Sequence, residues 1–279
     1  MTEAMGSLGA DIPCRKCGYN LRGLNVEGKC PECGTMVGLS VSGDLLRFSD
    51  PEWVQGLGSG VRLILWGVVV MIVAMAAGVV LTLMREKLLG SLMTLGAQGL
   101  SLAGWWILTR PDPSGIGEDR YGKARQIIRI GLIGGMVGSG CYIVAQDSIG
   151  YEQDTALIIH FVGQILALVG LVAQLQYLKK LAVRIPDDGL KERAGFLQHA
   201  LGWTYGVSMA GGMAMMVLAK MKKPQSSMMV GFGCGAAIVG MVMLVFWIMF
   251  LVMIGKFGKR FKEQAEYGRQ AWAGQGLKV

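Results

Sequence analysis

Residues 228–254 read MMVGFGCGAAIVGMVMLVFWIMFLVMI, a run without a single charged side chain. A helix needs about 17–25 mostly apolar residues to cross the roughly 30 Å hydrocarbon core of a bilayer. In that core every backbone polar group must bond within the protein, and the run lacks the alternation of a barrel strand. The stretch therefore predicts a transmembrane helix and an all-α membrane protein.

The composition of the whole chain favours the same class. Hydrophobic residues make up 52% and charged residues only 16%, whereas soluble domains carry about 25% charged residues. The mean hydropathy is +0.46. A net charge of +8 is explained by basic loops on one side of a membrane, which leaves nucleic acid as the less favoured partner.

Five further apolar runs lie before residues 228–254 in the chain, and charged or turn-forming segments separate them. The run at 200–219 is the weakest because it contains Thr204, Tyr205 and Ser208. We expect a domain at 61–255 with six transmembrane helices in three hairpins, at residues 61–84, 88–109, 130–146, 155–177, 200–219 and 228–254.

Residues 42–60 link this domain to the N-terminus and contain a helix start. Pro51 suits the first helical position, and Glu52 suits the positive end of the helix dipole. We expect either a helix at the membrane interface, with Trp53 among the headgroups, or an N-terminal extension of the first span.

The basic residues predict the orientation. With six spans, the N-terminus, the loops at 110–129 and 179–193, and the tail share one side, and that side carries most of the Lys and Arg near the membrane. The positive-inside rule then places both termini in the cytoplasm, at the inner membrane of a bacterium. The tail at 256–279 combines Phe257 and Phe261 with basic residues, which predicts an amphipathic helix on the anionic inner surface of the bilayer.

Four cysteines form two close pairs near the N-terminus, in the segments Cys14-Arg15-Lys16-Cys17-Gly18 and Cys30-Pro31-Glu32-Cys33-Gly34. A tetrahedral metal takes four thiolates at about 2.3 Å, and a C-x-x-C turn supplies two of them. The following glycines permit a left-handed backbone. We predict a structural metal domain at 1–41, without an open coordination position, in a reducing compartment. Its ligands are Cys14, Cys17, Cys30 and Cys33; residues 1–13 are expected to be disordered.

The run C-G-Y-N-L-R-G-L from Cys17 to Leu24, with C-P-E-C-G from Cys30 to Gly34, resembles the N-terminal zinc ribbon of bacterial membrane proteins of unknown function. It is also similar to the rubredoxin-like domain of rubrerythrins, except that residues 21–24 replace the acidic and aromatic arm of that domain. The first resemblance implies zinc and the second an iron centre for one-electron transfer; four-sulfur sites hold either metal. We favour zinc, because no diiron helix pattern is present.

Few polar side chains lie inside the predicted spans, where polar groups often mark functional sites. His160 and His199 fall on different spans, roughly 20 Å apart along the membrane normal by helical rise, so we expect packed or interfacial histidines rather than a haem pair. The glutamines are expected to bond between helices, at Gln98, Gln164 and Gln174. The sequence shows no catalytic motif, and we predict no catalytic site.

Three functions compete. We favour an interaction module, in which the basic cysteine domain binds an acidic protein partner through Arg15, Lys16, Arg22 and Lys29. The alternatives are a transporter or channel lined by Gln98, Gln164 or His160, and a rubredoxin-like electron carrier. The glycine pairs four residues apart predict close helix packing inside the bundle rather than oligomerisation; they are Gly131/Gly135, Gly134/Gly138, Gly202/Gly206 and Gly231/Gly235.

Overall fold

The computed structural model describes residues 7–42, 44–83, 87–113, 118–145, 151–185, 187–220 and 226–273. Over these residues the regular structure is helical, and three isolated β-bridges near the N-terminus are the only strand-like pairs. The prediction of an all-α protein is confirmed. The elements are α1 (Val37–Val41), η1 (Leu46–Phe48), α2 (Pro51–Leu83), α3 (Lys87–Leu108), α4 (Glu118–Ala145), α5 (Tyr151–Arg184), α6 (Asp188–Lys220) and α7 (Ser226–Trp272).

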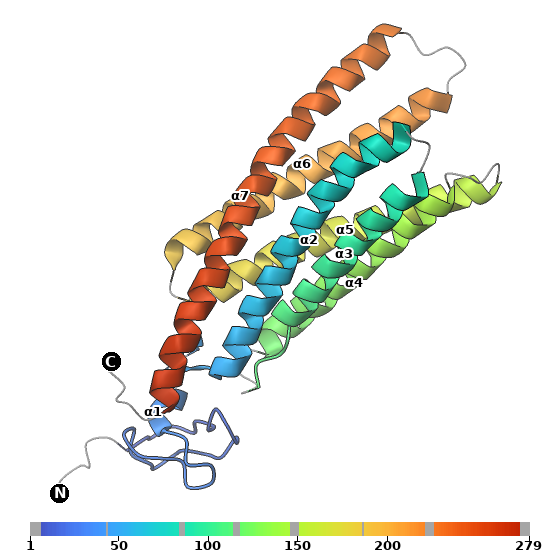
Figure 1. Ribbon diagram of the computed structural model, residues 1–279. Coiled ribbons are helices and arrows are strands. Elements are labelled where there is room, and N and C mark those ends of the chain that lie inside the picture. The colour runs from blue at the N-terminus through green and yellow to red at the C-terminus, as the bar shows by residue number, and fades with distance from the viewer. Residues whose placement is uncertain are drawn as a thin grey trace, which may run out of the picture.

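The long helices α2 to α7 form one elongated bundle (Figure 1). Helix α2 packs on α3, α4 on α5, and α6 on α7, and the remaining neighbours are α3 with α4, α5 with α6, and α2 with α7. The helices therefore follow one another around a ring that α2 and α7 close. The cysteine-bearing segment lies at the end of the bundle where α2 begins and α7 ends (Figure 1). We call this end the cysteine end and the other the far end.

Four of these helices contain a segment long and apolar enough to cross a membrane, and they indicate a membrane protein. The other two long helices, α3 and α6, are comparable in length to these four over the described residues. Polar side chains interrupt their apolar sequence: Gln98 and Ser101 in α3, and Thr204 and Ser208 in α6. The span count of six stays a prediction. The four segments are Pro51–Gly78, Tyr121–Ile143, Gln153–Arg184 and Gly233–Ala271.

The helices continue well past the predicted apolar runs at the cysteine end. Helix α2 begins at Pro51, where Asp50 Oδ1 accepts a bond from the Glu52 amide at 2.8 Å. The linker helix is thus an extension of the first predicted span. Helix α4 already starts inside the predicted loop at 110–129. The loops expected near residues 85, 147 and 222 lie largely outside the described residues, as does the chain after residue 273.

The buried core explains these extensions. Leu57, Tyr177, Phe257 and Phe261 are among the largest fully buried side chains, and all belong to one cluster at the cysteine end. Residues 256–272 continue α7, and their apolar side packs in the protein core, where α7 meets α2, instead of facing a membrane surface. Farther along the bundle, large apolar side chains are exposed instead, including Val69, Ile72, Ile158, Val207, Met241 and Leu244.

The polar side chains inside the bundle bond between helices. Gln98 Nε2 on α3 donates to Ser139 Oγ on α4 at 3.1 Å, and the Tyr205 hydroxyl on α6 donates to Gln164 on α5. His160 Nδ1 lies 3.1 Å from the Gly138 carbonyl oxygen. The interhelical role predicted for Gln98 and Gln164 is confirmed, and the three side chains considered for a pore each contact a neighbouring helix.

The glycine pairs divide into two groups. A Cβ added at Gly131 on α4 would lie 2.6 Å from Gly170 Cα on α5, and one added at Gly138 would lie 3.1 Å from Gly163 Cα. Close packing is confirmed for these α4 glycines. The prediction is wrong for α7, because a Cβ at Gly235 would meet no described atom within 4 Å. The same holds for Gly206 and Gly231.

Candidate metal centre

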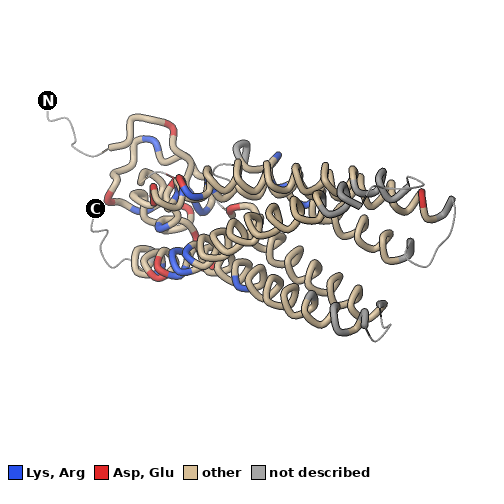
Figure 2. Tube along the Cα trace, turned by 90° about the horizontal axis from the view of Figure 1, so that it is seen from above, with Lys and Arg blue, Asp and Glu red and all other residues tan. Residues whose placement is uncertain are grey.

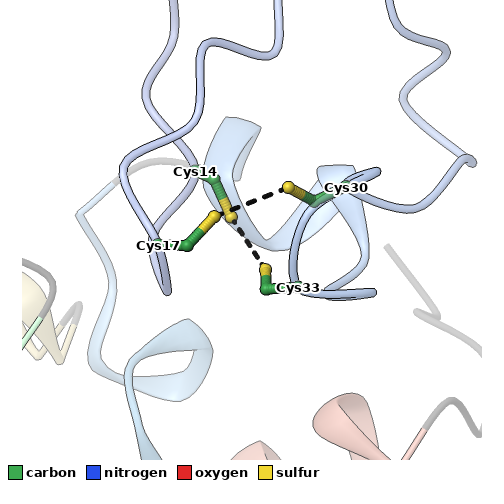
Figure 3. Close-up of side chains that lie close together, drawn as sticks. All are labelled: Cys14, Cys17, Cys30 and Cys33. Atoms are coloured by element: carbon green, nitrogen blue, oxygen red, sulfur yellow. Dashed lines mark hydrogen bonds between the residues drawn. The ribbon is translucent and has the colours of Figure 1, made fainter.

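The four paired cysteines converge on one point (Figure 3). Their sulfur atoms all lie within 4.8 Å of one another. The distances from Cys14 Sγ to Cys33 Sγ and from Cys17 Sγ to Cys30 Sγ are both 3.6 Å. A disulfide would need about 2.05 Å, so all four are free thiols. A tetrahedron with metal–sulfur bonds of 2.3 Å has edges of about 3.8 Å, and the cluster therefore suits one four-coordinate metal ion.

Two turns of the same design present these sulfurs. In the first, the Gly18 amide donates to the Cys14 carbonyl at 2.8 Å, and the Cys14 amide donates to the Tyr19 carbonyl at 2.7 Å. The second turn repeats both bonds around Cys30, at 2.9 and 2.7 Å. The φ angles of Gly18 and Gly34 are 79° and 70°, in the left-handed region where only glycine is free of strain. Each C-x-x-C-G sequence thus curls its backbone around a pair of thiols.

A very small apolar core supports the two turns. Leu21 and Val37 are fully buried against Cys14 and Cys30. Leu8 also packs there, and its amide donates to the Leu24 carbonyl at 2.9 Å. The expectation of disorder is therefore wrong for residues 7–13, which the core draws in, and residues 1–6 lie outside the described part. So few apolar side chains cannot stabilise a fold without a cross-link or a metal.

Crowding separates the pKa values of the thiols. Burial raises the pKa of Cys33, but its hydrogen bonds with the Thr35 side chain and backbone and with other thiols outweigh it, and the pKa falls to about 6. The Tyr19 amide lowers the pKa of Cys17, but desolvation and its bonds to the other three sulfurs raise the pKa to about 12. Four thiolates so close together repel one another unless a cation lies between them. The donor set therefore fits a thiophilic divalent ion.

A buried network of charges lies beside the cysteine turns. Arg184, at the end of α5, contacts Asp112 Oδ2 and Asp44 Oδ1, each at 2.7 Å. Its Nη2 also donates to Ser49 Oγ at 3.2 Å, and its guanidinium lies 5.4 Å from the Trp53 ring centroid. The Arg184 and Asp112 side chains are only 5% and 2% exposed. One side chain thus connects the linker, the start of α2, the segment after α3 and the end of α5.

Arg15 adds a second cation to this network. In the sequence it lies between Cys14 and Cys17, yet it is buried. Its backbone amide donates to Ser40 Oγ at 3.0 Å. Burial lowers the pKa of Arg15, while the charges of Asp112 and Asp44 oppose that shift. The positive charges of two arginines and the negative charges of two aspartates therefore balance one another between the cysteine turns and the helices. The prediction that Arg15 belongs to an exposed basic surface is wrong.

The sequence reasoning found the cysteines but missed this network. Asp112 and Arg184 each stand within two residues of a proline at the end of a predicted span, in the segments Arg110-Pro111-Asp112 and Arg184-Ile185-Pro186. That recurrence is the one local signal that could have drawn attention to them, and it does not show that they are buried or that they pair with each other. His199, by contrast, is exposed on α6 and has no place in the site.

The chain has no match among protein-family models, curated proteins or solved structures. The similarity to zinc ribbons and rubredoxin-like domains therefore rests on residues 14–34 alone. Any assignment of function has to come from the geometry of the site and from the apolar helices.

Proposed function

We propose that this chain is a multi-pass protein of the bacterial inner membrane, with six transmembrane helices and cytoplasmic termini, whose four paired cysteines hold one structural zinc ion. The observation that carries the metal proposal is the convergence of four sulfurs at spacings close to those of a tetrahedron. Four thiolates leave no open position, so the ion stabilises a fold rather than binding substrate. The ligands are Cys14, Cys17, Cys30 and Cys33.

We further propose that the zinc ribbon is a cytoplasmic interaction module for an acidic protein segment. Lys16, Tyr19 and Lys29 are exposed, whereas Arg22 is already paired with Asp11 at 3.5 Å. The network around Arg184 supports this role, because it fixes the position of the ribbon relative to the helices. A partner bound to the ribbon would thereby be held at the membrane.

Metal analysis and a visible absorption spectrum of the purified full-length protein test the metal. We expect one zinc ion per chain and no visible band, and we expect the double variant Cys14→Ser/Cys30→Ser to lose the zinc. A red protein with one iron per chain would instead support the electron-transfer alternative, since ferric iron with four sulfur ligands absorbs visible light. A metal-free protein would contradict both.

Reporter fusions test the topology. A fluorescent protein fused after residue 279 should fold in the cytoplasm, and alkaline phosphatase inserted at residue 222 should be active outside. Inactive phosphatase at 222 together with active phosphatase at the C-terminus would mean that one predicted span does not cross.

Crosslinking in cells tests the interaction module. A photoreactive residue replacing Tyr19 should capture a partner, and the capture should disappear in the variant Lys16→Glu/Lys29→Glu, whose zinc content should be unchanged. The matched control places the same photoreactive residue at Val69, which is exposed among apolar side chains. If capture at position 19 does not depend on the two lysines, the proposed acidic partner is wrong.

A further inference from the structure

A crevice of about 430 Å³ separates α2 from α7 at the cysteine end. One part of its lining is apolar and consists of Val61 and Leu65 on α2 with Gly255 and Gly258 on α7. The other part is mainly basic, with three cations and one carboxylate among Arg62, Lys262, Glu266 and Arg269. A site with this division suits a molecule that has an anionic head and an apolar chain.

The crevice lies at the edge of the exposed apolar surface. On α2, Trp66 is one turn beyond Arg62 and is 62% exposed. On α7, Val252 is one turn before Lys256 and is 52% exposed. Tryptophan favours the level of the lipid headgroups, and both helices contain a candidate span. With predicted spans that begin at residue 61 and end at residue 254, we expect the basic part of the crevice at headgroup level, at the end of the bundle where most Lys and Arg gather (Figure 2).

The cations in this crevice are available for a ligand. Within the described residues, Arg62 and Lys262 have no carboxylate partner, and Arg269 donates to the neutral Gln55 side chain. The cleft on the other side of α7 has an equal excess of cations, but Arg260 there is already paired with Asp187 and Glu263, and among the described residues Leu190 is the only large apolar side chain in its lining. The apolar part of the lining therefore favours the crevice between α2 and α7 as the site for a lipid.

A glycine keeps the apolar part of the crevice open. A Cβ added at Gly255 would meet no described atom within 4 Å. A large side chain at this position would project into space that the protein does not fill. The position thus offers a way to block the crevice without removing any charge.

We propose that this crevice binds an anionic phospholipid, whose phosphate lies between Arg62 and Lys262 and whose acyl chain lies along Val61 and Leu65. The site rests on the assignment of α2 and α7 as membrane helices and is independent of the zinc proposal. It would anchor α7 to α2 where the helices leave the bilayer. Each basic residue near an anionic lipid surface contributes about fivefold in affinity, so the loss of both cations should weaken binding roughly 30-fold.

Native mass spectrometry of the full-length protein, titrated with phosphatidylglycerol or with phosphatidylcholine of the same acyl chains, tests the site. We expect tight binding of phosphatidylglycerol alone, and a loss of about 30-fold in the variant Arg62→Ser/Lys262→Ser. Gly255→Leu should weaken binding without any change of charge. The matched controls are Lys123→Ser/Lys191→Ser, which removes two exposed cations elsewhere, and Gly240→Leu, a glycine that also faces open space; both should bind as the unmodified protein does.

Three outcomes would overturn the proposal. The first is unchanged binding in both Arg62→Ser/Lys262→Ser and Gly255→Leu. The second is equal affinity for the two lipids. The third is displacement of phosphatidylglycerol by millimolar inorganic phosphate, which would make the crevice a site for a free anion. Circular dichroism identifies a variant that fails to fold. One variant changes the charge of the crevice and the other its shape, so if one of them does not fold, lipid binding by the other still tests the site.

Discussion

The cysteine end and the far end of the molecule are held together by different contacts. At the cysteine end, aromatic side chains such as Tyr177 and Phe261 are fully buried, and Arg184 is paired with the buried Asp112. At the far end, large apolar side chains are exposed and α4 meets α5 through glycines. The cysteine end therefore has the contacts of a water-soluble core, whereas the far end requires lipid around it, where close packing replaces the hydrophobic effect between helices.

Metal removal should give the largest effect and should separate the two ends. A structural zinc ion supplies on the order of 10–16 kcal/mol of folding free energy, and residues 7–41 have almost no other core. After chelation, hydrogen exchange should become fast in 7–41 and stay slow in 131–138 and 163–170. Equal acceleration in all three segments would show that the far end depends on the metal and would contradict the division.

Arg184→Leu should weaken the contact between the segment that bears the cysteines and the helices. Removing one partner of a buried ion pair costs about 3–5 kcal/mol, because the remaining charge is left unpaired. The free energy of unfolding measures the loss, and Arg193→Leu, which removes an exposed cation nearby, is the matched control. Adding Asp112→Asn to Arg184→Leu should restore part of the stability; if it does not, the cost of the first change is not electrostatic.

Gly131→Leu should disturb the contact between α4 and α5 and leave the cysteine turns intact. The added side chain would begin 2.6 Å from Gly170 Cα, and such overpacking costs about 1–3 kcal/mol. Gly235→Leu is the control, since its side chain would enter open space on α7. Denaturant titration in micelles should show a lower stability for the first variant alone. A similar loss in both would mean that α7 is also packed closely.

The smallest effect should be a pH dependence at the cysteine end. Burial raises the pKa of Asp187, but the Leu190 amide at 3.1 Å and Arg260 at 3.0 Å outweigh it, so the pKa lies below the ordinary value of 3.8. A lowered pKa means that ionised Asp187 stabilises the fold at pH values above its ordinary pKa. The contribution is lost as the pH falls through the folded-state pKa. Asp187→Asn should cost about 0.5–1 kcal/mol at pH 7.

Stability measured at pH 7 and again near pH 3 tests this sign. The difference between Asp187→Asn and the unmodified protein should be smaller at the lower pH, because the carboxylate of the unmodified protein is partly protonated there. A difference that grows with acidity would show that the pKa of Asp187 is raised rather than lowered.

The sequence was sufficient to predict those parts of the structure that depend on residues close together in the chain. Apolar runs located a part of each long helix, mostly the part toward the far end, and the spacing of Cys14, Cys17, Cys30 and Cys33 located the cluster. It was insufficient where distant residues meet. The buried Arg184–Asp112 pair joins residues 72 positions apart, and nothing local marks either as buried. The glycine pairs show the same limit, because Gly131 needs a small residue opposite, and only the fold reveals that Gly170 is there.

Helix α7 runs unbroken for 47 residues and contains no proline. At 1.5 Å per residue it is about 70 Å long, roughly twice the hydrocarbon thickness of a bilayer. Near its C-terminal end the Tyr267 ring packs against Phe48 of η1, with ring centroids 6.3 Å apart. One end of α7 is therefore held: if the helix stays straight, a tilt of about 10° about that end displaces the opposite tip by about 12 Å. The tilt of α7 at the far end is thereby geometrically linked to the cysteine turns at the other end of the molecule.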